Sequence, residues 1–455
     1  MAKSSKNQGA RASRKRAPTK RRGGTVFAII VLVALVFLAI YLFWRVMALQ
    51  SRDTNPAPAA TSTALSSVVP TMSASPIVTA EPTAEPTRAE STASPTPATN
   101  TDASSTNGLR SAHIRVVGDV MFHQTQLDFA KKSNGTYDFD DQFAYIKDSL
   151  SDADFTIANL ETTVGKHKNV AYSGYPQFNT PEVVLQTLKE SGIDFFTMAN
   201  NHMLDRWFEG LVNDVDLVEE YGFDHVGAYR TKKERNTPVV YEVNGIKIGF
   251  VAYTHATNNM ENHSNEAAVE YGVPYLYQAD IAGDIKKLRD AGAEVVIALP
   301  HWGTENVNTP DETQRQYAKK LASAGADIIL GSHSHMVQPM ELVEGTDANG
   351  IDRQVFIIYS MGNFISSMTT KYTDCGIILD FTIQEQTDGT FRVEDIGYVP
   401  VYVWKQNGVF AVISSAKYLD KKPDGMNSSQ YTQMVKTYHQ MVDRLGTDGF
   451  TVLTE

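Results

Sequence analysis

Seven short apolar runs between residues 113 and 359 alternate with amphipathic segments, and this alternation constrains the fold more than any other feature. The runs predict strands at 113–117, 155–158, 195–198, 247–253, 295–299, 328–330 and 355–359. The amphipathic segments predict helices at 181–190, 211–221, 281–291 and 313–323. The order predicts an α/β fold with a mixed sheet, or with two sheets packed face to face and helices outside.

Local signals refine this assignment at three places. Pro181 suits the first position of its helix, where the missing N–H costs nothing. Asn244-Gly245 between two apolar runs predicts a hairpin. Alternating runs at 376–383 and 391–403 predict strands added after the alternation ends.

The N-terminal part of the chain predicts a membrane anchor. Residues 25–44 contain no charge, and a helix of that length, at about 1.5 Å per residue, spans the roughly 30 Å of hydrocarbon in a bilayer. Residues 1–24 form a basic segment, which the positive-inside rule places in the cytoplasm. The alternative is a cleaved secretory signal, and both interpretations export the remainder.

Residues 45–111 are dominated by Ser, Thr, Pro and Ala, and we expect them to form a disordered stalk. The folded domain is then predicted over 112–455, on the outer side of the cell membrane. Cys375 is the single cysteine, so neither an intramolecular disulfide nor a thiolate zinc cluster is possible.

Charge excludes one class of partner. The first 22 residues hold nine Lys or Arg and no Asp or Glu, and removing this +9 from the overall −11 leaves −20 for the rest of the chain. Binding of nucleic acid requires a basic face, so the acidic character of residues 23–455 argues against a nucleic-acid partner. It suits divalent cations better. The simpler explanation is that the acidity keeps a surface domain soluble.

Polar side chains follow five of the predicted strands. They are Gly118 and Asp119; Asn159 and Glu161; Asn200, Asn201, His202 and Asp205; His301 and Glu305; and His333 and His335. In open α/β sheets the ligand crevice lies outside the carboxyl ends of the strands, so these turns are expected to converge. Carboxylate, amide oxygen and imidazole nitrogen together suit Zn, Mn, Fe or Ni.

Each of these residues alone has an ordinary explanation. Asp119, Glu161 and Asn201 suit turns or helix caps, and His301 suits a cap or a simple hydrogen bond. His333 and His335 alternate, which predicts both rings on one side of an extended segment, with a solvated pair as the alternative.

The motif series GDVMFH, NLE, ANNHMLD, PHWGTE, GSHSH and YSMGNF resembles the capsule-synthesis CapA family, also called the poly-gamma-glutamate synthesis PgsA family. That family belongs to the calcineurin-like metallophosphoesterase superfamily. The resemblance covers roughly residues 112–370. It implies a four-layer fold, with two mixed sheets between helices.

The resemblance also implies site roles. Asp119 and His335 would bind a first metal, and Glu161 takes the place of a bridging Asp. The second metal would be bound by Asn201, His301 and His333. His202 would face the substrate, oriented by Asp205, which alternatively caps the following helix.

One departure from the superfamily pattern concerns the first metal. A His usually stands two residues after the first Asp, and here that position is Met121. The alternative is that His123 replaces it. We therefore expect one or two metal ions.

Three functions follow from these expectations. The first is metal-dependent hydrolysis or transfer on an anionic envelope polymer or phosphoester, by a membrane protein of capsule or poly-gamma-glutamate synthesis. The second is a non-catalytic accessory subunit of a polymer synthesis or export complex. The third, a solute-binding ectodomain, is least consistent with so many residues of metal-ligand type.

Overall fold

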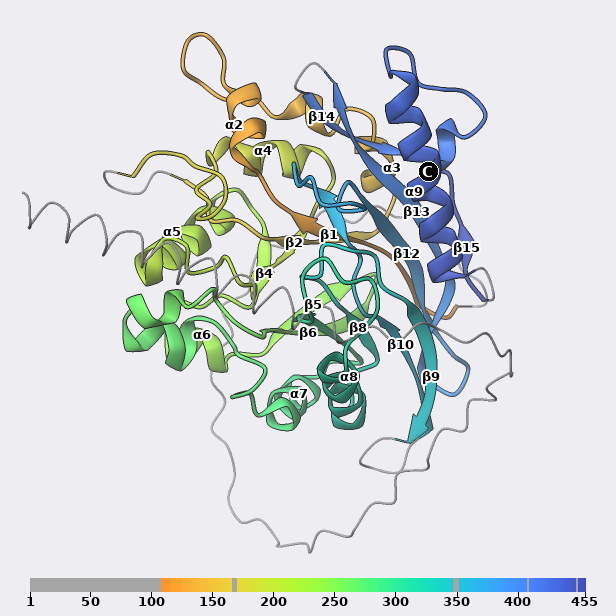
Figure 1. Ribbon diagram of the computed structural model, residues 1–455. Helices are drawn as coiled ribbons and strands as arrows, with labels where there is room; N and C mark the ends of the chain where they lie inside the picture. The colour runs from red at the N-terminus through yellow and green to blue at the C-terminus, as the bar shows by residue number, and fades with distance from the viewer. Residues whose placement is uncertain (1–107, 166–169, 347–351, 407–408, 447–448) are drawn as a thin grey trace, which may run out of the picture. The chain divides into compact units, whose positions relative to one another are not determined.

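The computed structural model describes residues 108–165, 170–346, 352–406, 409–446 and 449–455 (Figure 1). The basic segment 1–24, the transmembrane helix 25–44 and the stalk up to residue 107 lie outside these residues and stay predictions. None of the helices in the described ranges has the length and apolar character that a bilayer crossing requires.

The first sheet is mixed. Its strands are, in spatial order, β14 (Val409–Ser414), β13 (Phe391–Gln406), β12 (Cys375–Glu385), β1 (Ser111–Val120), β2 (Phe155–Leu160), β3 (Phe195–Thr197) and β4 (Asp224–Val226). β11 (Asn363–Ile365) also pairs with β1, and β15 (Thr451–Val452) pairs with β13. β1 to β4 are parallel, whereas β1, β12, β13 and β14 are successively antiparallel.

The second sheet is mixed as well. Its order is β5 (Val239–Val243), β6 (Ile246–Thr254), β7 (Val295–His301), β8 (Ile328–Leu330), β10 (Asp352–Ile358) and β9 (Met340–Thr346). The four inner strands are parallel, and β5 and β9 run antiparallel at the edges. The hairpin predicted at Asn244-Gly245 is confirmed: it joins β5 to β6, with φ of 49° and 78°, both left-handed as a tight hairpin turn requires.

A core lies between the two sheets because successive residues of a strand point to opposite faces. On β6, Ile248 and Phe250 belong to this core, whereas Val251 and Tyr253 belong to the core on the outer face of the second sheet. β1, β2 and β12 of the first sheet contribute to the same central core. Both faces of each sheet are therefore apolar, as expected for sheets covered on both sides.

Helices cover the two outer faces. The first sheet is covered by α2 (Gln124–Ala130), α3 (Lys147–Ser151), α4 (Val183–Glu190) and α5 (Trp207–Glu220), and the second by α7 (Ile281–Asp290) and α8 (Glu312–Ala324). α6 (Lys232–Asn236) follows β4, and α9 (Ser428–Leu445) packs on β13. Short 3-10 or π turns stand at η1 (Asp140–Gln142), η2 (Met260–His263), η3 (Ala268–Gly272) and η4 (Ala416–Tyr418). The four-layer arrangement implied by the resemblance is thus confirmed (Figure 1).

All seven predicted strands and all four predicted helices are present, with ends that differ by a few residues. The assignment of Pro181 was wrong. α4 begins at Val183 after the N-cap residue Glu182, and the carbonyl of Pro181 accepts a hydrogen bond from the Val184 N–H at 3.0 Å. This four-residue turn leads into the helix, so Pro181 stays outside it.

Candidate metal centre

Asp119 is positioned near the carboxyl ends of β1 and β2, beside the start of β11. It stands opposite Asn159 of β2 and Asn363 of β11, at a bulge near the end of β1. Gly118 makes this approach possible, since a Cβ there would lie 2.0 Å from the carbonyl oxygen of Gly362. Asn159 Nδ2 donates to Asp119 Oδ1 at 2.8 Å, which fixes the carboxylate.

Glu161 follows β2 directly and is fully buried. Its backbone N–H donates to the carbonyl of Val120 at 3.1 Å, so the residue is held against the end of β1. Its Oε2 accepts a longer contact, 3.4 Å, from Asn159 Nδ2. Its Oε1 is buried and has no hydrogen-bond partner among the residues that the structure describes. A buried carboxylate oxygen without a partner is costly, and binding of a cation would satisfy it.

The second sheet supplies three histidines. His301 ends β7, and His333 and His335 lie in the loop after β8. The prediction of an extended His333–His335 segment was wrong, because φ is 93° at His333 and 57° at His335. The same loop places Ser332 Oγ 3.0 Å from His301 Nδ1. A solvated pair is also excluded, since both rings are 4% exposed.

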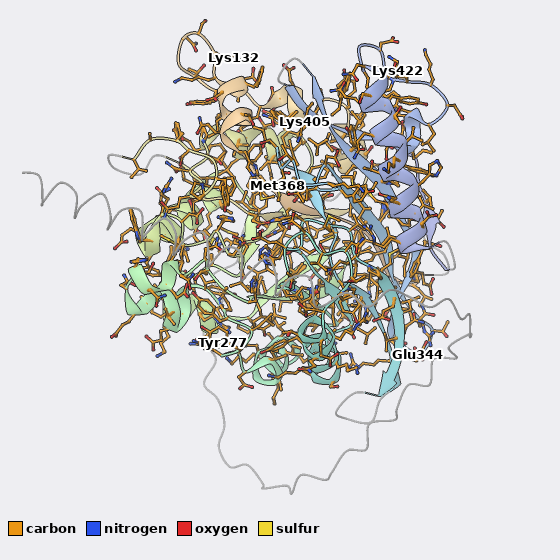
Figure 2. All side chains as sticks on the ribbon, in the orientation of Figure 1. Lys132, Tyr277, Glu344, Met368, Lys405 and Lys422 are labelled. Carbon is orange, nitrogen blue, oxygen red and sulfur yellow. The ribbon has the colours of Figure 1, made fainter. Side chains whose placement is uncertain are left out.

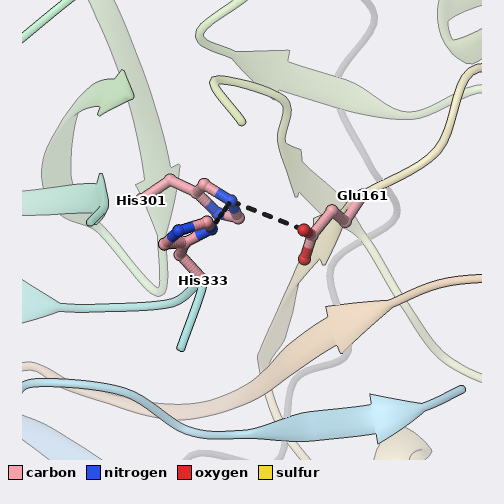
Figure 3. A group of neighbouring side chains, drawn as sticks. All are labelled: Glu161, His301 and His333. Atoms are coloured by element: carbon pink, nitrogen blue, oxygen red, sulfur yellow. Dashed lines mark hydrogen bonds and ion pairs between the residues drawn. The ribbon is translucent and has the colours of Figure 1, made fainter. Parts of the chain in front are cut away.

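Glu161, His301 and His333 form the first donor group (Figure 3). Nε2 of His301 lies 3.1 Å from His333 Nδ1 and 3.5 Å from Glu161 Oε1. Asn201 joins them, with its Oδ1 2.8 Å from the same Nε2. One ring nitrogen can satisfy only one of these neighbours with a proton. Several nitrogen and oxygen lone pairs therefore face one another, and this arrangement suits a cation bound between them.

Asp119, Glu161 and His335 form the second donor group. His335 Nδ1 lies 3.0 Å from Asp119 Oδ2 and 3.1 Å from Asn363 Oδ1. Glu161 belongs to both groups, whose ligand atoms in each case lie within 4.8 Å of one another. The two groups match the division between first and second metal that the resemblance implies, with Glu161 as the shared residue.

Electrostatics favour divalent cations at both groups. Burial raises the pKa of Glu161 well above its usual value, and the nearby Asp119 adds to this. Burial also lowers the pKa of His301 and of His333 well below the usual range, with neighbouring histidines as the next cause. Neutral imidazole is the form that binds metal, and a cation would relieve the repulsion between the two carboxylates. The donor set thus fits the metals that the sequence predicts.

Met121 is buried and its backbone N–H donates to Ile365, so it makes no contribution to either group. His123 belongs to neither donor group among the described residues. Its Nδ1 accepts from the Ser367 N–H at 3.4 Å instead. The alternative that His123 replaces the missing ligand gains no support from this geometry.

His202 lies in the turn after β3, which Asn200 holds in place. Asn200 Nδ2 donates to the carbonyl of Leu160 at 2.8 Å, and its Oδ1 accepts from the His202 N–H at 3.1 Å. The His202 ring stands edge-on to Phe178, with centroids 4.6 Å apart. The alternative role of Asp205 as a helix cap was wrong: α5 begins after Arg206, and Asp205 Oδ2 instead contacts His202 Nδ1 at 2.8 Å.

Sequence reasoning missed two side chains of the centre. His255 follows β6, and its ring centroid lies 4.3 Å from that of His333. Asn363, in the YSMGNF motif, contacts His335 as described above. The signal that could have found His255 is the one used for the other residues, a polar side chain directly after a strand.

Comparison with known proteins adds the family. The model of the family described as bacterial capsule synthesis protein PGA_cap matches residues 113–368, a span that holds every predicted site residue. The chain belongs to this family. The predicted CapA resemblance is thereby confirmed.

Two PGA_cap relatives and one solved structure illustrate the similarity. The PGA biosynthesis protein CapA of Bacillus subtilis is 26% identical over 62% of this chain and 70% of its own length. The capsule biosynthesis protein CapA of Bacillus anthracis is 28% identical over 59% of this chain and 63% of its own length. The calcineurin-like phosphoesterase YfkN of Bacillus subtilis aligns with 74% of this chain and 98% of that chain, at 15% identity and a TM-score of 0.36.

Proposed function

We propose that this protein catalyses metal-dependent hydrolysis or transfer on a cell-envelope substrate during capsule or poly-gamma-glutamate synthesis. The observation that carries the proposal is the pair of donor groups that share Glu161, whose Oε1 has no hydrogen-bond partner in the described part of the chain. Asp119, Glu161 and His335 would hold one cation, and Glu161, Asn201, His301 and His333 the other. Two divalent cations supply charge stabilisation to the attacking and leaving oxygens of a displacement.

The residues around the donor groups would handle the proton. His202 would donate from Nε2 to the leaving oxygen, since its Nδ1 is engaged by Asp205 at 2.8 Å. Asp205 is held by the Phe178 N–H at 2.7 Å, so the pair has a fixed orientation. Burial of both side chains keeps bulk water from competing for that proton.

Turnover of a generic phosphodiester tests this proposal. We expect the full-length protein, loaded with Mn²⁺ or Zn²⁺, to hydrolyse bis(p-nitrophenyl) phosphate, and chelator-treated protein to lose that activity. Metal-loaded protein without turnover of phosphodiester or of γ-linked glutamate peptides would contradict the catalytic role.

The second candidate is an accessory subunit whose metal is structural. It is favoured by the burial of the centre, because structural metal sites are closed whereas catalytic ones keep an open position. The same assay separates the two, since an accessory subunit retains metal and supports polymer production without turnover.

We further propose that the domain lies outside the cell membrane on a single N-terminal helix, where it would meet the polymer and other synthesis or export subunits. The basis is the charge-free segment 25–44 with its basic flank. Protease added to intact cells should remove the domain and leave the N-terminus protected. A soluble full-length protein in the cytoplasm would overturn this topology.

A further inference from the structure

Lys405 is a partly buried cation near the end of β13, after the span that the family model matches. Its Nζ donates to the backbone carbonyl of Met368 at 2.7 Å (Figure 2). The ammonium also lies 5.7 Å from the centre of the Phe410 ring. One carbonyl and one aromatic ring are weak compensation for a charge that has left water.

The described part of the chain offers Lys405 no ion pair. Asp374 acts on it through space and raises its pKa, but burial is the larger cause and the pKa is lowered overall. Gln433 Nε2 donates to Asp374 Oδ2 at 3.5 Å, and Asp374 Oδ1 has no hydrogen-bond partner among the described residues. A cation in this situation is stabilised by any anion that can reach it.

The segment 366–368 links Lys405 to the metal centre. Asn363, which contacts the metal-group residue His335, donates from Nδ2 to Met368 Sδ at 3.4 Å and to Ser366 Oγ at 3.0 Å. Met368 in turn accepts from Lys405. Lys405 is thus separated from the second donor group by one short stretch of chain.

Two further donors lie at this segment: Ser367, which is part of it, and His123, which contacts it. Ser367 N–H donates to His123 Nδ1, so the neutral His123 ring carries its proton on Nε2 and can donate there. Ser367 Oγ accepts from Thr125 Oγ1 at 2.9 Å, which leaves its own hydrogen to donate. Ser367 and His123 are only partly buried, so both can meet a ligand.

We propose that Lys405, Ser367 and His123 form an anion subsite beside the metal centre, which binds a carboxylate or phosphate group of the substrate next to the reacting one. All three groups donate, so the subsite selects for anionic oxygen. It places a cation where an acidic body would otherwise repel an anionic polymer. That the bound anion belongs to the substrate rests on the proposed function. Anion binding itself can be measured whether or not the protein has catalytic activity.

Calorimetric titration of the metal-loaded full-length protein tests the subsite. The probes are inorganic phosphate and γ-glutamyl-glutamate, because they represent the two sources of anionic oxygen. Lys405→Met should weaken binding of at least one probe about tenfold or more at unchanged metal content. Lys405→Arg should retain most of the affinity. Lys132→Met is the matched control, since Lys132 is exposed and paired with Asp138 at 3.0 Å, and it should bind as wild type does.

The outcomes are separable from those of the catalytic proposal. Loss of phosphate binding alone identifies a phosphate subsite, and loss of dipeptide binding alone a carboxylate subsite. If Lys405→Met lowers the melting temperature, the affinity of Ser367→Ala for the two probes is compared with that of wild type instead. We expect Ser367→Ala to lose less affinity than Lys405→Met. Equal affinity of Lys405→Met and wild type for both probes overturns the subsite, as does a metal-loaded wild type that binds neither. If anion binding depends on Lys405 but the protein shows no turnover, the anion subsite is supported and the catalytic function is contradicted.

Discussion

His202 Nδ1 lies 2.8 Å from Asp205 Oδ2, and the same carboxylate oxygen accepts the backbone N–H of Phe178 at 2.7 Å. The contact gives the His202 ring one orientation. Neither residue belongs to a donor group among the described residues. The proposed function assigns the pair to the substrate rather than to a cation.

His202→Ala should consequently separate chemistry from metal binding. We expect metal content and melting temperature close to wild type, with turnover lowered about 10²–10⁴-fold, the usual contribution of general acid–base assistance. His439→Ala, which removes an exposed histidine of α9, is the control and should leave turnover unchanged. Normal turnover by His202→Ala would contradict the role of His202 as the proton donor, and normal polymer production without turnover in both proteins would favour the accessory-subunit interpretation.

Gly118 tests the packing that positions Asp119. An alanine Cβ would meet the backbone oxygen of Gly362 at 2.0 Å, and neither strand can yield without moving the other. We expect Gly118→Ala to destabilise the domain by about 1–3 kcal/mol, as other overpacked sites do, and to lower metal content. Denaturant unfolding with elemental analysis measures both. Unchanged stability would show that β1 and β11 are not in such close contact.

His113 provides a pH-dependent test away from the metal centre. Its Nε2 lies 2.8 Å from Asp380 Oδ2, and this hydrogen bond raises the pKa of His113 above its usual value despite partial burial. A raised folded-state pKa adds stability below the unfolded value of about 6.5, and this stability is lost as the pH rises through the folded value. His113→Gln should therefore lower the melting temperature more at about pH 5.5 than at about pH 9. An equal loss at both pH values would exclude the charged pair.

Much of the fold follows from local pattern, because strands such as β6 alternate between two apolar cores and leave an unambiguous signal. The convergence of Asp119, Glu161 and His301 was also predictable, since each follows a parallel strand. The conformation at His333 and His335 was not, because alternation in sequence says nothing of a left-handed backbone. His255 was missed although it directly follows β6 and carries the same signal as the other residues.

The partners of Asp205 illustrate a second limit. Its contacts with His202 and Phe178 join segments that are up to 27 residues apart, and a carboxylate just before a helix suits a cap equally well by sequence. Tertiary structure decided between the two roles. The same applies to Lys405, whose approach to the segment 366–368 is not visible in any local motif.

The central claim is that Glu161 is shared between two cations, and elemental analysis of purified variants tests it most directly. Wild type should hold between one and two transition-metal ions, because Met121 stands where the superfamily has a ligand. His333→Ala and His335→Ala should each lose metal from one donor group. Glu161→Ala should lose metal from both groups, so its metal content should be lower than that of either histidine variant. Metal content of Glu161→Ala equal to that of wild type would contradict the account.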